Sequence, residues 1–178
     1  NNAHPEYAKP EYKNAKVPTL DEILSRYGTK ANYYIETKNP NVYPGMEEQL
    51  LETLKKHHML TGNSLNHGHI LIQSFSEESL QKMHQLDSSV PLIQLLDKNE
   101  LQQQSEADLK HIRSYAIGVG PDYTSLNAEN TKHLKDLGFL IHPYTVDKTT
   151  DMQRLNQYGV DGLFTNFADK YKATIPNE

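Results

Sequence analysis

Short apolar runs alternate with amphipathic segments along the whole chain. Each run has the length and the β-branched or aromatic content of a buried strand, and polar residues follow it. The segments between the runs repeat their apolar positions with the 3.6-residue period of a helix. Six strands are predicted, one in the stretch 33–40 and the others at 69–75, 91–96, 114–119, 139–146 and 160–164.

Capping residues mark the predicted helices. Thr19 and Glu22 have the spacing of a capping box, and Gly28 follows the segment 20–27 as a stop. In the helix predicted over 46–60, Glu47 and Glu48 lie off the apolar face. The other predicted helices are one capped by Ser76 and opened by Glu77 and Glu78, one starting at Ser105, 127–137, and one capped by Thr150 and ended by Gly159. Residues 1–16 and 61–68 and the C-terminal tail are predicted to lack regular structure.

This alternation predicts the fold class. Strands separated by helices are typical of an α/β protein with a parallel sheet and helices outside it. Right-handed crossovers carry the carboxyl ends of all the strands to the same side. The spacing fits either an open doubly wound sheet or a (β/α)8 barrel.

The stretch Tyr33–Pro40 carries the strongest chemical signal. Apolar residues lead into Glu36, Thr37 and Lys38, and the stretch then breaks at Asn39-Pro40. Side chains two positions apart on a strand lie on the same face. Glu36 and Lys38 are therefore expected to face the same side at the carboxyl end of the sheet, the mouth where ligands bind in α/β proteins. A carboxylate and an ammonium there suit a divalent cation and the anion that it holds, such as a phosphate. A solvated ion pair is the structural alternative.

Other polar and aromatic residues end the later strands. Their amides, hydroxyls and rings suit a small polar anion better than a lipid tail or a peptide. Glu36 alone supplies too few oxygen ligands for Ca²⁺ or Mg²⁺. The candidates for this mouth are Glu36, Lys38, Gln73, Phe75, Gln94, Asp122, His142, Tyr144, Asp147, Thr165 and Asn166.

Composition narrows the function classes. The 178 residues carry 18 basic and 23 acidic side chains, a net charge of -5 that argues against a nucleic-acid binder. No apolar run approaches the roughly 20 residues of a membrane span. With no cysteine in the chain, any metal must be held by oxygen or imidazole ligands.

Other catalytic patterns are weak. Gly118-Val119-Gly120 runs into Pro121 and is expected to be a turn rather than a nucleotide cradle. Ser74 lacks the context of a nucleophile elbow, and no Ser/His/Asp set gathers at the strand ends. Pro143 inside the run 139–146 indicates a bulge or an early end of that strand.

Five ordered motifs carry a family resemblance. They are Val17-Pro18-Thr19-Leu20-Asp21-Glu22, Ile35-Glu36-Thr37-Lys38, Gln73-Ser74-Phe75, Tyr144-Thr145-Val146-Asp147, and the segment Gly159-Val160-Asp161-Gly162-Leu163-Phe164-Thr165-Asn166. Together they resemble the later part of the glycerophosphodiester phosphodiesterase family, particularly its bacterial secreted-type members. The motifs span nearly the whole chain, and each is weak alone.

The resemblance assigns roles by position. Glu36 matches the family's metal-binding glutamate, and Lys38 the lysine that contacts the substrate phosphate. Phe75 matches the aromatic residue that lines the glycerol pocket, with Gln73 beside it. Tyr144 stands where the family usually has Trp, and its ring keeps an aromatic wall. Asp147 stands where the family has Asn, and Asn166 where its motif ends in Thr-Asp.

The resemblance also implies a fold and an activity. The fold is a parallel (β/α)8 barrel of the TIM type, of which residues 1–178 supply about six βα units as one domain. The implied activity of the complete protein is hydrolysis of small-molecule glycerophosphodiesters to glycerol 3-phosphate and an alcohol, with Ca²⁺ or Mg²⁺. The family's first two βα units carry its catalytic histidine pair and most of its metal ligands. Nothing in residues 1–31 matches these units, and His4-Pro5 is not the family's His-Arg motif.

Two alternative functions remain open from the sequence. A catalytically inactive barrel fragment or module would bind a glycerophosphate-like ligand without turnover. A phospholipase resembling sphingomyelinase D would share much of the metal chemistry, but its lipid-facing aromatic loops are not evident. The resemblance to secreted members implies an extracellular or cell-surface location, with the cytoplasm as the alternative, and the oligomeric state is open.

Overall fold

Five parallel strands form a single sheet in the computed structural model, which describes residue 5 and residues 8–175. The sheet order follows the chain, β1-β2-β3-β4-β5, and every neighbouring pair is parallel. A doubly wound sheet reverses its order at a switch point, whereas sequential parallel neighbours are those of a (β/α)8 barrel. The strands are Tyr33–Glu36, Ile70–Ser74, Leu92–Leu96, Gly118–Pro121 and Leu140–Ile141.

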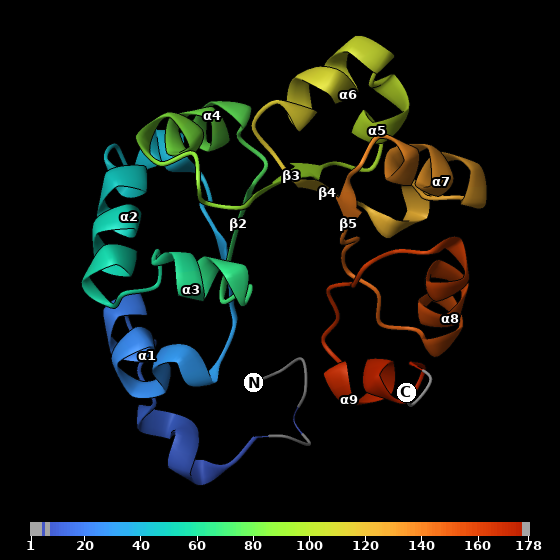
Figure 1. Cartoon of the computed structure of the whole chain (residues 1–178). Helices are drawn as coiled ribbons and strands as arrows, with labels where there is room; N and C mark the ends of the chain where they lie inside the picture. The colour runs from blue at the N-terminus through green and yellow to red at the C-terminus, as the bar shows by residue number, and fades with distance from the viewer. Residues whose placement is uncertain (1–4, 6–7, 176–178) are drawn as a thin grey trace.

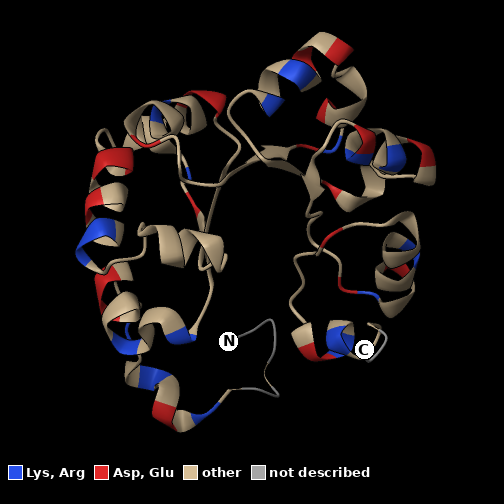
Figure 2. Cartoon of the chain, viewed as in Figure 1, with Lys and Arg blue, Asp and Glu red and all other residues tan. Residues whose placement is uncertain are grey.

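Helices lie outside the strands, in an arc that starts at α1 and ends at α9 (Figure 1). The helices carry most of the charged residues, and strands β2 to β5 contain none (Figure 2). The α-helices are α1 Leu20–Tyr27, α2 Met46–Lys56, α3 Gly62–Asn66, α4 Glu77–Leu86, α5 Glu100–Gln103, α6 Glu106–Arg113, α7 Ala128–Asp136, α8 Thr149–Tyr158 and α9 Ala168–Lys172. Short 3-10 helices are η2 Pro10–Asn14, η3 Gly28–Lys30, η4 Pro40–Val42 and η5 Tyr123–Ser125. No described helix is both long and apolar enough to cross a bilayer.

Two faces of the sheet have different surroundings. Alternate strand residues such as Ile72, Leu92 and Val119 face the helices and form the main core with helix leucines. The opposite face is the inner side of the arc, where Tyr34 and Glu36 of β1 lie at the register of Leu71 and Gln73 of β2. This register continues through Ile93 and Gly118 to Leu140. Glu36 therefore lies on the inner face, at the carboxyl end of the sheet.

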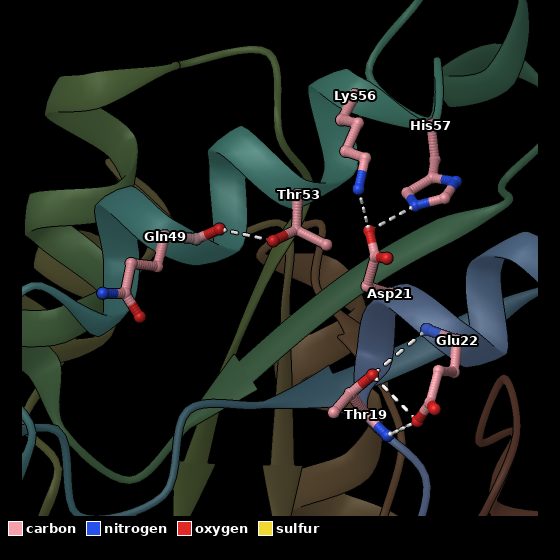
Figure 3. Close-up of polar contacts among 7 residues, drawn as sticks. All are labelled: Thr19, Asp21, Glu22, Gln49, Thr53, Lys56 and His57. Atoms are coloured by element: carbon pink, nitrogen blue, oxygen red, sulfur yellow. Dashed lines mark hydrogen bonds and ion pairs between the residues drawn. The ribbon is translucent and has the colours of Figure 1, made fainter.

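The predicted capping box at the start of α1 is confirmed. Thr19 Oγ1 accepts from the amide of Glu22 at 3.2 Å, and the Glu22 carboxylate accepts from the amide of Thr19 at 2.8 Å (Figure 3). In the same first turn, the Asp21 carboxylate contacts Lys56 Nζ at 2.6 Å and His57 Nε2 at 2.8 Å (Figure 3). These contacts join α1 to the end of α2.

The prediction of a sixth strand at 160–164 is wrong, because this segment is not a regular strand. It nevertheless makes backbone hydrogen bonds to β5 and to the residues after it. The amide of Asp161 donates to Ile141 O at 3.0 Å, and the amide of Phe164 to Pro143 O at 2.9 Å. Pro143 has no N–H to return a hydrogen bond, so the ladder is interrupted between these two contacts. The same proline ends β5 at Ile141, far short of the predicted 139–146, as its position indicated.

The fourth strand begins later than predicted, and the Gly-x-Gly segment lies within it. Residues 114–117 belong instead to the end of α6 and the turn after it, where Tyr115 and Ala116 are buried. A Cβ on Gly118 would lie 2.6 Å from Leu140 O, and one on Gly120 would lie 2.7 Å from Leu95 Cδ2. Glycine is therefore required by close packing between strands, and the expected turn is wrong.

Smaller differences concern helix ends and loops. The helix predicted over 46–60 ends at Lys56, and the chain turns through His58 at φ 58° while Met59 stays buried. The expected loops 61–68 and 1–16 contain α3 and η2, and α9 lies in the expected tail. Thr150 lies inside α8 rather than capping it. His4 lies outside the described residues.

Candidate functional site

Glu36 and Lys38 lie beside one cavity at the carboxyl end of β1. Glu36 is the last residue of the strand and is half-buried, while Lys38 is exposed in the loop that follows. The cavity, of about 270 Å³, is lined by residues 36–41, from the end of β1 and this loop, and by residues 74–76, from the end of β2 and the loop after it. Among the described residues, neither Glu36 nor Lys38 makes a side-chain hydrogen bond or an ion pair. Both charges are thus available to a ligand instead of being neutralised by each other.

Gln73 pairs in register with Glu36 on the inner face. Its side chain is only 7% exposed, and its Oε1 atom has no hydrogen-bond partner among the described residues. Leaving a buried amide oxygen unpaired costs about 1–3 kcal/mol. An oxygen held in this way beside a carboxylate suits a cation or a hydroxyl donor from a ligand.

Phe75 and Tyr144 form the aromatic wall that the sequence predicts. Their ring centroids lie 5.7 Å apart with an interplanar angle of 84°, an edge-to-face contact. Phe75 is 46% exposed, so its ring can contact a ligand. The Tyr144 hydroxyl donates to Leu96 O at 2.9 Å, and burial raises the pKa of that hydroxyl. Tyr144 therefore stays protonated and offers its ring rather than its hydroxyl.

Asp147, Thr165 and Asn166 are brought together, but they bind one another. Asp147 Oδ1 accepts from the Asn166 amide at 2.9 Å and from Thr165 Oγ1 at 3.2 Å, while Oδ2 accepts from Asn166 Nδ2 at 3.0 Å. These donors, the Asn166 backbone first, lower the pKa of Asp147. The carboxylate joins the chain after β5 to the segment that ends at residue 166.

Of three other mouth candidates, Gln94 points away from the mouth and its expected place there is wrong, whereas Asp122 and His142 contact neighbouring residues of this chain. Gln94 lies on the helix-facing side of β3, where it accepts from the Tyr115 hydroxyl at 2.8 Å. Asp122 accepts from Thr124 in its own turn. His142 lies near Tyr34, whose hydroxyl is 2.9 Å from its Nδ1, and burial lowers the pKa of this histidine. Register and local turns decide these directions, which strand ends alone do not reveal.

A buried polar group behind the loop 36–41 was missed by the sequence reasoning. Glu47 is 4% exposed, so its expected place off the buried face of α2 is wrong. Its carboxylate accepts from Ser79 Oγ at 2.7 Å and from Lys82 Nζ at 3.1 Å. Ser79 and Lys82 are 32 and 35 positions from Glu47 in the sequence, so no local sequence pattern predicts these contacts.

The donor set can be tested against a divalent cation. Glu36 and Gln73 offer a carboxylate and an unpaired amide oxygen on one face, the hard ligands that Ca²⁺ and Mg²⁺ prefer. Over residue 5 and residues 8–175, no group of three or more His, Asp or Glu side chains is arranged to hold a metal. These residues fit one side of a cation site, and a full shell requires further oxygen ligands.

The sequence of the chain is similar to those of known proteins. A family model, described as the glycerophosphoryl diester phosphodiesterase family, matches residues 2–170. A glycerophosphodiester phosphodiesterase of Bacillus subtilis strain 168 is 51% identical over 171 residues, which cover 96% of this chain and 58% of that relative.

Solved structures are similar in fold. A phosphodiesterase of Oleispira antarctica, in complex with the product sn-glycerol-3-phosphate, has a TM-score of 0.76 at 18% identity over 92% of this chain and 63% of its own. A glycerophosphodiester phosphodiesterase of Parabacteroides distasonis has a TM-score of 0.69 at 19% identity over 88% of this chain and 63% of its own. The chain thus spans 58% of the Bacillus relative and 63% of each of these two structures.

Proposed function

The chain belongs to the glycerophosphoryl diester phosphodiesterase family, and on that premise we propose that the complete protein hydrolyses glycerophosphodiesters to glycerol 3-phosphate and an alcohol. The observation that carries the proposal is the unpaired Glu36 and Lys38 beside one cavity at the carboxyl end of a parallel sheet. The 51% identity to an enzyme named for this activity supports it.

Each residue of the site has a role in the proposed mechanism. Glu36 holds a divalent cation, Ca²⁺ or Mg²⁺, together with oxygen ligands from outside the described residues. When bound, the cation neutralises charge that develops on the phosphoryl group. Lys38 binds a phosphoryl oxygen as a point charge and stabilises the same developing charge. The catalytic proton transfers belong to histidines that, by the family resemblance, precede this part of the barrel.

The neighbouring residues bind the glycerol portion. Phe75 and Tyr144 pack their rings against its carbon atoms, and Gln73 Oε1 accepts from a glycerol hydroxyl or reaches the cation. The unpaired oxygen of Gln73 gains a partner only when the ligand is present, so binding recovers the cost of burying it. A small glycerophosphodiester has the size and polarity of this cavity.

The proposal is tested by charge removal in the complete protein. We expect Glu36→Gln to weaken Ca²⁺ or Mg²⁺ binding and to lower kcat more than about 100-fold, since ligand loss exceeds the effect of losing an outer-shell partner. We expect Lys38→Met to lower kcat about 100-fold with the cation affinity retained. Hydrolysis of glycerophosphocholine and calorimetric cation titration measure both effects.

Matched controls lie on α2. Glu52→Gln and Lys55→Met remove exposed charges of the same kind outside the cavity. Both controls are expected to keep wild-type turnover and cation affinity. Wild-type activity in Glu36→Gln would refute the assignment of the metal ligand.

A second candidate is a module that binds without turnover. It is favoured for this portion of the chain by the absence, among the described residues, of a group of three potential metal ligands. Calorimetry of the 178-residue chain with glycerol 3-phosphate, with and without Ca²⁺, distinguishes the two functions. Binding together with no hydrolysis of glycerophosphocholine by the complete protein would favour the module.

The extent and location of the protein are further proposals. We place residues 1–178 in one barrel whose first two βα units lie outside this chain. We assign the protein to the cell exterior on the resemblance to secreted members of the family. Fractionation of cells with an antibody to this chain tests that location, and recovery in the cytoplasm would overturn it.

A further inference from the structure

A network of buried polar side chains lies directly behind Glu36 and Lys38. Thr37, between these two residues, projects to the opposite face of the strand and is 2% exposed. Its Oγ1 lies 3.0 Å from Ser79 Oγ on α4, and Ser79 Oγ lies 2.7 Å from Glu47 Oε1 on α2. The three side chains thus join the loop after β1 to the two helices that flank it.

The ionised carboxylate of Glu47 fixes the direction of these hydrogen bonds. A carboxylate only accepts, so the Ser79 hydroxyl donates its hydrogen to Glu47. The Ser79 oxygen can then only accept from Thr37, whose hydroxyl donates. Each hydroxyl therefore has one orientation, and the rotamer of Thr37 is fixed together with the backbone between Glu36 and Lys38.

The backbone of Thr37 is held at the same time by the last two residues of β2. Its amide donates to Gln73 O at 3.0 Å, and its carbonyl accepts from the buried Ser74 hydroxyl at 2.8 Å. Ser74 Oγ in turn accepts from the amide of Ser76 at 3.1 Å, on the other side of Phe75. Both loops that line the cavity are thereby held in one geometry.

The buried carboxylate of Glu47 is unfavourable for stability at this position. Burying a carboxylate costs several kcal/mol before its partners are counted, and an apolar residue of similar volume is often as stable. Lys82 pairs with Glu47 at 3.1 Å and remains partly exposed. A buried charge that orders a hydroxyl chain toward the candidate site is consistent with a positioning role.

We propose that Thr37, Ser79 and Glu47 are positioning residues that hold Glu36 and Lys38 in the geometry for binding the cation and the phosphoryl group. The inference rests on the proposed function, because it assigns these two side chains to cation and phosphate. Thr37 lies on the wall of the cavity, but its hydroxyl is turned toward Ser79 on the side of the strand away from Glu36. Ser79 and Glu47 lie outside that lining, so the three hydroxyl and carboxylate groups act through the loop.

The main test is Thr37→Val in the complete protein, which removes one hydroxyl, keeps the shape of the side chain and leaves the Ser79–Glu47 contact intact. Calorimetric titration with Ca²⁺ and with Mg²⁺, without substrate, is expected to show an affinity about 10-fold weaker than in the wild type. Thr37→Ser restores the hydroxyl and is expected to bind within about 2-fold of the wild type. Ser79→Ala is expected to weaken the affinity like Thr37→Val, and the double variant no more than either one, because both break the same chain.

A matched control separates positioning from loss of stability. Ser64 on α3 is 3% exposed and is likewise a buried serine, but it contacts Met59 rather than the loop after β1. Ser64→Ala is expected to keep the cation affinity whatever its effect on thermal unfolding. Equal weakening in Ser64→Ala, or wild-type affinity in folded Thr37→Val, would overturn the inference.

The two proposals fail in different ways. If Glu36 does not hold the cation, Glu36→Gln itself binds like the wild type, and the proposed function is wrong. If Glu36→Gln loses the cation while Thr37→Val retains it, the proposed function stands and the positioning role is wrong. Hydrogen exchange of the amides over 36–41 gives a second readout, with faster exchange expected in Thr37→Val.

Discussion

Asp147 and Asn166 depart from the family's sequence pattern in opposite senses, and the structure places them in contact. Where the resemblance leads one to expect an amide and then a carboxylate, this chain has a carboxylate and then an amide. Two hydrogen bonds join the Asn166 amide groups to Asp147, at 2.9 and 3.0 Å. Either order leaves one charged acceptor facing one amide donor, so the exchange preserves the contact.

This reading predicts coupling between the two positions. Asn166→Asp puts two carboxylates in contact, and Asp147→Asn weakens charge-assisted hydrogen bonds, so each is expected to lower Tm by about 2–4 °C at pH 7. The double variant with both exchanges restores a carboxylate–amide pair and is expected to recover most of the loss. Thermal unfolding followed by circular dichroism measures the coupling, with Asp169→Asn on α9 as the exposed control. Strictly additive losses would contradict the exchange.

Among the elements, the positions of the strands were predictable and their ends were not. A buried strand appears in the sequence as an apolar run, which located all five strands of the sheet. Residues 114–117 look like part of such a run, yet Tyr115 and Ala116 are buried in the turn that follows α6. Close strand packing uses Gly118 and Gly120, which resemble turn residues in the sequence.

Substitution of a glycine by alanine is expected to have opposite effects on stability in β4 and in α3. In Gly118→Ala the new methyl group would lie 2.6 Å from the backbone oxygen of Leu140 and from Ile93 Cδ1, so β4 must move. We expect a loss of about 1–3 kcal/mol in the free energy of unfolding. In Gly62→Ala, at the start of α3, no atom lies within 4 Å, and a gain of about 0.4–1 kcal/mol is expected. Urea unfolding measures both, and an unchanged midpoint for Gly118→Ala would be the contrary result.

For the whole molecule, the parallel α/β architecture was predictable because strand and helix periods alternate so regularly. The site was predictable in part. Glu36 ends β1, and Lys38 and Phe75 follow β1 and β2 beside the same cavity, whereas the direction of Gln94 depends on register. The network of Thr37, Ser79 and Glu47 joins residues up to 42 positions apart, and only the packed structure brings them together.

The stability of the whole molecule at low pH depends on carboxyl groups in several of its elements. Native contacts lower the pKa of six described carboxyl groups below their ordinary values of 3.8 or 4.5, namely those of Asp21, Glu22, Glu47, Glu48, Asp108 and Asp147. At Glu47 burial opposes the lowering of the pKa, but the hydrogen bonds from Ser79, from the backbone of Glu47 itself and from Lys82 together outweigh it. Several of these contacts join different elements, such as Asp21 between α1 and α2.

A lowered pKa in the folded state fixes the sign of the pH dependence. The unfolded chain binds protons at a higher pH than the native one, so these groups contribute stability above the ordinary carboxyl values. That contribution is lost as the pH falls through the lowered native values. We therefore expect the urea midpoint to decline below about pH 4.5, with the steepest loss near or below pH 4. Glu47→Gln should flatten the decline. Glu52→Gln, which removes an exposed carboxyl without a hydrogen bond or an ion pair among the described residues, should leave the decline unchanged. A midpoint that stays constant down to pH 3 would show that the native contacts do not favour the ionised carboxylates.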